Sequence, residues 1–351
     1  MRFNPAIALT AGLIAAAAPA AELPTTQPTK VTLAIEARNG AEAATQLTQQ
    51  LGFPVGMQQQ VPRGIQFQSG EQPLVPALCA FFDKADVSPG DNDTMYLADG
   101  SPLSVVPLSD TAALVLTRTT VNASVQLNTE RPQTGYNYTI NLLLLTDPAL
   151  KIVSAGRSAT IDAIEYDGTP RDVSFGSGPS QMNLSSITWP VAVQFASTTA
   201  VKSVKRVTGR IRCRQVIEEA SVDVGINDLM DGREVAGGAI TVTAKIDDNI
   251  DRNVALSVTL SGPAVELYAD PRWQQQLRNC VQAVNEQGRA LPLPANNITR
   301  DPAGKKLTMR LMSARGNVES VLNELDRVRV RVPTKVRMID VPFEFKDLPL
   351  P

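Results

Sequence analysis

From about residue 103 onward, the chain consists of short runs in which apolar and polar residues alternate, separated by turns rich in Gly, Pro, Ser and Asp. A period of two puts every second side chain on the same face of a strand, so that one face can be buried. Several such runs at regular spacing are typical of a sandwich or barrel. The predicted strands are 121–127, 138–146, 159–166, 189–195, 201–216, 239–246, 253–261, 280–285, 306–312, 325–332 and 335–346, with one short helix at 272–279.

Residues 30–102 follow a different pattern, which predicts an α+β domain in the order strand, helix, strand, strand, helix, strand. Asn39 followed by Glu42 is typical of a helix N-terminus, and Gly52 is typical of its end. Leu74, Leu78 and the phenylalanines that follow mark one apolar face of the second helix. The fold class predicted for the whole chain is therefore this α+β domain followed by mainly-β, sandwich-like domains.

The length of 351 residues predicts two or three domains and a core large enough to need no metal or disulfide. Composition is ordinary for a globular protein, with 43% hydrophobic and 19% charged residues. The net charge of −2 gives no electrostatic case for binding nucleic acid. The predicted division is a signal peptide at 1–21, a linker at 22–29, the α+β domain at 30–102, and two β-sandwich-like domains at 103–216 and 217–351.

The first residues have the three parts of a secretory signal. Arg2 supplies a positive charge, an apolar run of about 13 residues follows, and Ala18, Pro19 and Ala20 have the small-x-small form of a cleavage site. Because the run is shorter than the roughly 20 residues that span a bilayer, we expect cleavage near Ala21, with an uncleaved anchor as the alternative. The predicted location is periplasmic or extracellular, with no transmembrane segment after cleavage.

Several segments resemble a family of uncharacterised bacterial envelope proteins. The segments are VKRVTGRIRCR (204–214), INDL (226–229), VPTKVR (332–337) and the terminal VPFEFKDLPLP (341–351). Residues 30–102 resemble the secretin/TonB short N-terminal domain with which such proteins begin. The resemblance implies a periplasmic recognition or assembly unit followed by β-sandwich-like domains, and it implies no catalytic activity. Residues 103–200 depart most from the family pattern.

A faint internal repeat also appears. Residues 163–168 (AIEYDG) are similar to residues 283–288 (AVNEQG), an offset of 120 residues. Each segment places a glycine where a tight hairpin requires positive φ. The repeat predicts two related β units, although chance similarity is an alternative.

The absence of histidine excludes several catalytic systems. A Ser-His-Asp triad, a Cys-His pair and a two-His zinc site cannot form. Carboxylate or lysine chemistry stays open, but no pair of carboxylates can be chosen from sequence, because their separation is a spatial property. The chain has no nucleophile elbow and no nucleotide-binding glycine pattern after a strand. We therefore expect no catalytic residues and no cofactor.

Two groups of acidic residues are candidates for calcium loops. Residues 247–251 offer alternating carboxylates, but Arg252 and Val258 stand where a calcium loop needs Gly and Glu. Asp86, Asp91, Asp93 and Asp99 surround a Pro-Gly turn near the end of the α+β domain. Solvated turns are the simpler interpretation of both groups, so we expect no metal site.

Arginine alternates with apolar residues in two predicted strands. This pattern places the arginines on one face, which is either the wet face of a sheet or a contact surface for an anionic glycan, a lipid headgroup or an acidic protein. The candidate contact residues are Arg210, Arg212, Arg214, Arg327, Arg329 and Arg331.

The three cysteines carry different expectations. Cys79 lies on the apolar side of a predicted helix and is expected to be buried and unpaired. Cys213 and Cys280 lie in β-rich sequence, and an exported protein would permit them to form a disulfide, provided that the strands bring them together. The sequence does not decide whether they pair.

The function expected from these features is that of an exported, non-catalytic interaction or assembly module of the bacterial envelope. Its partner would be an envelope protein or an anionic glycan, bound through sheet edges and basic strand faces. The alternative is an exported hydrolase that uses carboxylates on a β scaffold.

Overall fold

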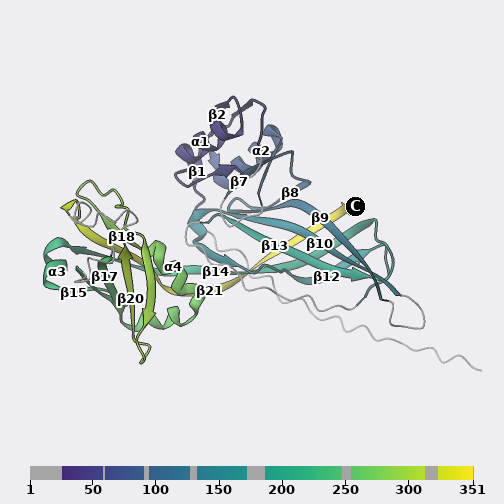
Figure 1. The fold of residues 1–351 in the computed structure, drawn as a ribbon. Helices are drawn as coiled ribbons and strands as arrows, with labels where there is room; N and C mark the ends of the chain where they lie inside the picture. The colour runs from purple at the N-terminus through teal and green to yellow at the C-terminus, as the bar shows by residue number, and fades with distance from the viewer. Residues whose placement is uncertain are drawn as a thin grey trace, which may run out of the picture.

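The computed structural model describes residues 26–57, 60–90, 95–126, 133–171, 186–246, 254–312 and 323–350 (Figure 1). Within these residues the protein is mainly β-structure, arranged in several sheets, with short helices. The predicted signal peptide and its cleavage site lie outside the described residues. No helix in the described ranges is both long and apolar enough to cross a bilayer.

Residues 30–99 contain two helices and several short strands. The elements are β1 (Lys30–Val31), β2 (Ala34–Ala37), α1 (Gly40–Leu51), β3 (Gly56–Met57), β4 (Ile65–Gln68), β5 (Gln72–Pro73), α2 (Leu74–Ala85), β6 (Val87–Pro89) and β7 (Tyr96–Asp99). Strand β2 pairs with β4, β1 pairs with β5, and β7 pairs with both β3 and β6. We call these residues the N-terminal unit.

Local sequence sets the ends of α1 as predicted. The Asn39 side chain accepts a hydrogen bond from the Glu42 backbone N–H at 3.0 Å. Gly52 ends the helix in the left-handed region, with φ of 74°. Glu42 does not complete the reciprocal bond of a capping box, because its carboxylate accepts from the Arg38 N–H instead.

Two glutamines of α1 cover the outer edge of β2. Gln50 accepts from the Ala34 N–H at 2.9 Å and donates to the Ala34 carbonyl at 2.7 Å. Gln46 pairs in the same way with Glu36, at 3.0 and 2.8 Å. Residues four apart lie on one side of a helix, so the two amides follow the strand edge and occupy the groups that another strand would use.

The middle β unit is a two-layered structure. Its elements are β8 (Ser104–Ser109), β9 (Ala112–Gln126), β10 (Gln133–Thr146), the short 3₁₀ helix η1 (Pro148–Leu150), β11 (Ile152–Ala155), β12 (Thr160–Tyr166), β13 (Thr188–Ser197) and β14 (Ser203–Gly225). One layer has the order β13-β10-β9-β8. The other contains β11, β12 and β14, and a core that includes Trp189 and Tyr138 lies between the layers.

The last strand of the chain completes this middle unit. Strand β21 (Arg327–Pro349) runs antiparallel to β14 along the full 23 residues of each. Its second half contributes Val341, Phe343, Phe345 and Leu348 to the core of the middle unit. The predicted strands 325–332 and 335–346 are therefore one continuous strand, and the predicted strand 201–216 extends to Gly225.

The remaining elements form an inserted β unit between β14 and β21. They are α3 (Ile226–Asp231), β15 (Glu234–Gly237), β16 (Ile240–Ile246), β17 (Val254–Ser261), the 3₁₀ segment η3 (Pro263–Ala269), α4 (Pro271–Cys280), β18 (Val281–Val284), β19 (Ala295–Arg300) and β20 (Lys306–Met312). Their sheet has the order β15-β16-β17-β20-β19 and packs against β18 and the near ends of β14 and β21. The linear division at residue 216 does not describe this arrangement, because the chain returns to the middle unit through β21.

The two β units share most of their strand order. In the middle unit β8, β9, β10 and β13 are neighbours in that order, and in the inserted unit β15, β16, β17 and β20 are neighbours in the same order. Strand β12 pairs with β14 as β18 pairs with β21. The first residues of β14 and β21 are 124 positions apart (327 − 203), close to the offset of 120 in the predicted repeat. This correspondence agrees with two related units that exchange their long strands.

The turn geometry of the repeat was predicted correctly at only one of its two glycines. Gly288 has a φ of 74°. Gly168 does not have positive φ. Instead, neighbouring side chains leave no room for a Cβ at this glycine. An added Cβ would lie 2.5 Å from a methyl carbon of Val201 and 2.7 Å from the Ser197 hydroxyl.

The N-terminal unit packs on the outer face of β9 and β10. Its apolar core continues into Ala113, Val115, Leu143, Leu145 and Ile187. Where the sequence predicted a loose linker, Thr29 is tied to Asp147: its N–H and hydroxyl donate to the two carboxylate oxygens at 2.9 and 2.7 Å. Asp147 is buried and also accepts from the Ala149 N–H. The N-terminal unit therefore shares its core with the middle unit.

Candidate functional site

The six candidate arginines alternate with buried residues as predicted. Ile211, Cys213, Val328 and Val330 point into the cores, whereas the arginines lie on the outer side. The two groups of arginines lie in different parts of the β14–β21 ribbon. Arg210 pairs with Pro342 and Arg329 pairs with Asp223, so 13 residues, or about 40 Å of strand, separate the two places. The structure does not bring the two groups into one patch.

Carboxylates neutralise most of these arginines. Arg210 contacts Asp162 at 2.9 Å and Arg212 contacts Asp340 at 3.3 Å. Asp223 lies between Arg327 and Arg329, at 3.3 and 3.1 Å. The hydrogen bond that Arg329 donates to Asp223 raises the pKa of Arg329. The outer side of the ribbon is therefore a surface of mixed charge.

The last two candidates differ from the other four. Arg214 is half-buried and lies opposite Met338. Arg331 is exposed opposite Ser221 and makes no ion pair within the described part of the chain. The alternation suggested a basic strand face free of carboxylates. Among the six candidates in the described ranges, only Arg331 fits that description.

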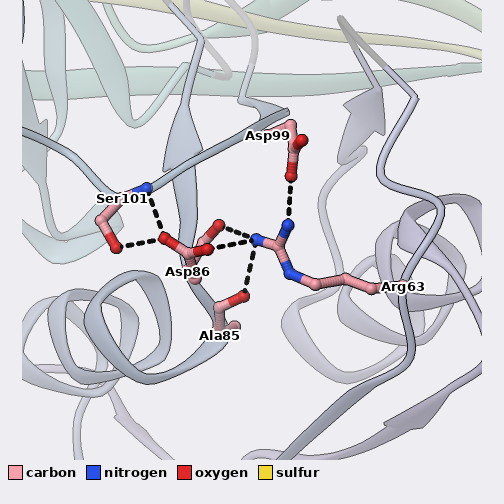
Figure 2. Close-up of polar contacts among 5 residues, drawn as sticks. All are labelled: Arg63, Ala85, Asp86, Asp99 and Ser101. Carbon is pink, nitrogen blue, oxygen red and sulfur yellow. Dashed lines mark hydrogen bonds and ion pairs between the residues drawn. The ribbon is translucent and has the colours of Figure 1, made fainter.

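The acidic cluster of the N-terminal unit holds an arginine (Figure 2). The Arg63 guanidinium contacts Asp99 and lies 3.1 Å from the Asp86 carboxylate, and it also donates to the Ala85 carbonyl at 3.3 Å. Ser101 donates to Asp86 from its N–H at 2.8 Å and from its hydroxyl at 2.6 Å. These bonds from Ser101, followed by the charge of Arg63, lower the pKa of Asp86.

Arg63 thus pairs with two of the four acidic residues, Asp86 and Asp99. Arg63 supplies the positive charge that the two carboxylates require, and it joins the end of α2 to β7. Asp91, Asp93 and the loop 247–251 lie outside the described residues. In the described ranges, no group of acidic, cysteine or histidine side chains could hold a metal ion.

A polar hollow on the inserted β unit was not predicted. It has a volume of about 480 Å³ and lies on the outer face of β16, β17, β19 and β20. Its lining is made of two cationic side chains, four hydroxyls and one amide, with no carboxylate among the described residues. The lining residues are Lys245, Ser257, Thr259, Asn297, Thr299, Thr308 and Arg310.

The strand register arranges these side chains in two rows. Ser257 lies between Lys245 and Arg310 across three adjacent strands. In the next row Thr259 pairs with Thr308, and their hydroxyl oxygens are 3.0 Å apart. Cross-strand neighbours lie within about 5 Å, so two cations flank a strip of hydroxyl donors. We call this surface, defined by the seven lining residues, the polar hollow.

Sequence alternation carried a signal for this surface. The runs 241–245, 257–261 and 306–310 each have a hydroxyl or cationic residue at every second position, and the intervening residues are buried. The individual side chains are ordinary for the wet face of a sheet. The register was needed to show that the three runs lie side by side.

The shifted carboxyl groups do not favour acid catalysis. Asp86, Asp167 and Glu344 have lowered pKa values. The backbone N–H of Ser203 stabilises the carboxylate of Asp167, and Arg206 stabilises that of Glu344. A general acid on a glycosidase needs the opposite shift, because it must keep its proton near neutral pH.

The three cysteines are free. Cys213 lies in the core of the middle unit and Cys280 in the core of the inserted unit. Because the two thiols lie in different cores, they do not form the disulfide that the sequence left undecided. Cys79 is half-buried, not fully buried as predicted. Burial raises the pKa of the Cys79 thiol to about 11 and that of the other two to about 12.

These pKa values predict slow, pH-dependent alkylation of Cys79 in the folded protein. The thiolate is the reactive form, and below pH 11 its fraction rises about tenfold with each pH unit. Mass-spectrometric mapping of alkylated cysteines at several pH values would measure this rise, and denatured protein provides the control with ordinary reactivity. Rapid labelling of Cys79 at neutral pH in the folded protein would contradict the prediction.

Comparison of the chain with protein-family models, with curated proteins and with solved structures finds no match.

Proposed function

We propose that this protein is an exported, non-catalytic interaction module of the bacterial envelope that binds an anionic polymer. The observation that carries the proposal is the polar hollow, in which Lys245 and Arg310 flank hydroxyl groups on a sheet face. Ammonium and guanidinium groups bind phosphate or carboxylate through charge-assisted hydrogen bonds, and neighbouring hydroxyls supply further donors. Two cations separated by a row of hydroxyls suit a chain-like ligand that carries more than one anion.

Export is proposed from the features of residues 1–21 and from the resemblance to envelope proteins. We also propose that residues 30–99 are related to the secretin/TonB short N-terminal domain. The order of their strands and helices supports this relationship. In this interpretation the N-terminal unit serves recognition or assembly and the inserted β unit holds the polymer.

Binding to two polyanions tests the proposal. Polyphosphate and a polyuronate offer the two anion types, and dextran is the neutral control. The double variant Lys245→Gln, Arg310→Gln should bind the preferred polyanion at least about tenfold more weakly, because a hydrogen bond to a charged group contributes about 1.5–3 kcal/mol. High salt should weaken binding by the wild type, since these cations are exposed.

Two further variants sharpen the test. Arg331→Gln removes an exposed arginine of the ribbon and should leave binding unchanged. Asp248→Asn with Asp251→Asn removes acidic charge next to β16 and β17 in sequence and should leave binding equal or stronger. Loss of binding only in Arg331→Gln would move the site to the ribbon. Failure of the wild type to bind either polyanion, or hydrolysis of one that depends on a single carboxylate, would overturn the proposal.

A further inference from the structure

Among the strands that the structure describes, none lies beside the outer edge of β9 over much of its length. Strand β8 pairs with β9 only as far as Leu116, where the Leu103 N–H donates to the Leu116 carbonyl at 3.0 Å. Beyond this point β10 continues beside β9 on the other side, through residue 126. Within the described residues, no strand pairs with residues 119–125 on the β8 side. A strand edge of this kind presents unpaired N–H and C=O groups.

Three other edges of the described sheets are protected. At the opposite side of the same sheet, the Ala192 N–H donates to the Arg157 carbonyl, and the Arg171 N–H donates to the Ala196 carbonyl, so crossing segments cover β13. The amides of Gln46 and Gln50 occupy the edge of β2. Strand β12 carries two register irregularities and two acidic residues. Bulges, charges and covering segments are the usual means by which proteins prevent edge pairing.

Within the described part of the chain, residues 119–125 of β9 have none of these protections, because the register irregularity of β9 lies at Thr117, before this segment. Strand β9 contains no proline, and Arg118 is its one charged residue. Residues 121–125 are all exposed, including Val121 at 37% and Val125 at 55%. These valines lie on the same face as Tyr138 and Tyr136, because Val121 pairs with Tyr138 and Ala123 pairs with Tyr136. Figure 1 shows β9 and β10 extending away from the inserted β unit, so that unit does not cover this edge.

We propose that two copies of this protein join through residues 119–125 of β9, in antiparallel pairing about a two-fold axis at Asn122. In this register Val121 faces Ala123 of the second copy, and Thr119 faces Val125 of the second copy. The apolar side chains then share one face of a continuous sheet, and only uncharged residues oppose one another between positions 119 and 125. The two Arg118 side chains lie at opposite ends of the joint, roughly 26 Å apart, so they do not repel.

This self-complementarity selects a second copy over an unrelated strand. A two-fold joint uses the same surface twice, which is the commonest symmetry of soluble dimers. The sheet would continue in the order β13-β10-β9 into β9-β10-β13 of the second copy. Because the joint is only seven residues long, we expect a reversible dimer whose population depends on protein concentration. The inference concerns β9 and is independent of the polymer proposed for the inserted unit.

Charge variants at the two-fold axis test the proposal in the full chain. Sedimentation velocity should show wild-type dimers that increase with concentration. Asn122→Lys and Asn122→Asp should each raise the dimer dissociation constant at least tenfold, because like charges then face each other directly. An equimolar mixture of the two variants should recover the dimer. Gln49→Lys adds the same charge at an exposed position of α1 and should leave the dimer unchanged. Thermal melting checks that every variant is folded.

Cross-linking provides a second measurement. At the two-fold axis the Cα atoms of position 122 in the two copies would be about 4.5–5.5 Å apart, within the range of a disulfide. Mild oxidation of Asn122→Cys should therefore yield a covalent dimer, whereas Gln49→Cys should not. A monomeric wild type at all concentrations, a dimer that persists in Asn122→Lys, or a charge-swapped mixture that stays monomeric would overturn the proposal. A monomeric chain that still binds polyanion would overturn the dimer alone and leave the proposed function standing.

Discussion

Replacing Phe343 by alanine is expected to destabilise the middle β unit by about 3–5 kcal/mol, the range for removing a buried phenylalanine. Phe343 lies near the C-terminus, yet it packs in the core that contains Trp189 and Tyr138. An added Cβ at Gly209 would lie 2.7 Å from its ring, so the ring fills the space that this glycine leaves. Removing it leaves a cavity that the surrounding strands cannot close.

The two tryptophans allow each β unit to be followed separately. Trp189 is buried in the middle unit and Trp273 in the inserted unit. In a Trp273→Phe background, Phe343→Ala should lower the denaturation midpoint reported by Trp189. In a Trp189→Phe background, the midpoint reported by Trp273 should change less. Leu277→Ala, in the core of the inserted unit, is the matched control and should give the reverse pattern. A Phe343→Ala effect confined to Trp273 would contradict the exchanged-strand arrangement.

Leu78→Ala should cost about 2–5 kcal/mol of stability in the N-terminal unit. Leu78 lies on the inner face of α2 and is fully buried. Its core includes Ala113 and Leu143 of the middle unit, so part of the loss should spread to β9 and β10. Hydrogen exchange of the α1 and α2 amides would show faster opening in the variant. Gln49→Ala, at an exposed position of α1, should leave exchange unchanged. Unchanged protection in Leu78→Ala would contradict the burial of this side chain.

The shared core around Leu78 also affects what we expect of residues 30–100 when they are expressed alone. Expressed alone, this segment would expose the apolar side chains that now contact Val115, Leu145 and Ile187. Sequence periodicity suggested an independent unit because each helix has its own apolar face. The structure shows that part of this core comes from the outer face of the neighbouring sheet.

Local sequence predicted most of the individual elements. The strands at 138–146, 189–195, 239–246 and 306–312 and the helix at 272–279 lie within or overlap observed elements of the same type. Short strands such as β11 and β15 were not predicted, because four residues give too little alternation to distinguish a strand from a loop. The predicted break between 332 and 335 does not exist. Pro333 lies opposite Glu219 at a register irregularity, where a residue without an N–H is tolerated in a ladder.

The candidate site shows the same division between local pattern and long-range pairing. Alternation correctly placed Arg210, Arg212 and Arg329 on an outer face, but their acidic partners were invisible to it. Asp340 lies 128 residues from Arg212, and Asp223 lies 106 residues from Arg329. The polar hollow combines the runs 241–245, 257–261 and 306–310, each of which is ordinary for the wet face of a sheet. Cross-strand register, which local periodicity does not specify, determines which charges meet.

The amino-acid sequence by itself determined the period of each element, the face that each strand buries and the chemistries that a chain without histidine cannot perform. These properties depend on residues a few positions apart, where backbone geometry fixes the relation between side chains. Tertiary structure alone decided that β21 closes the middle unit, that four of the six candidate arginines pair with carboxylates, and that no strand of the described ranges lies beside residues 119–125 of β9. These outcomes depend on pairing between distant segments, and that pairing is selected by the burial of whole apolar faces.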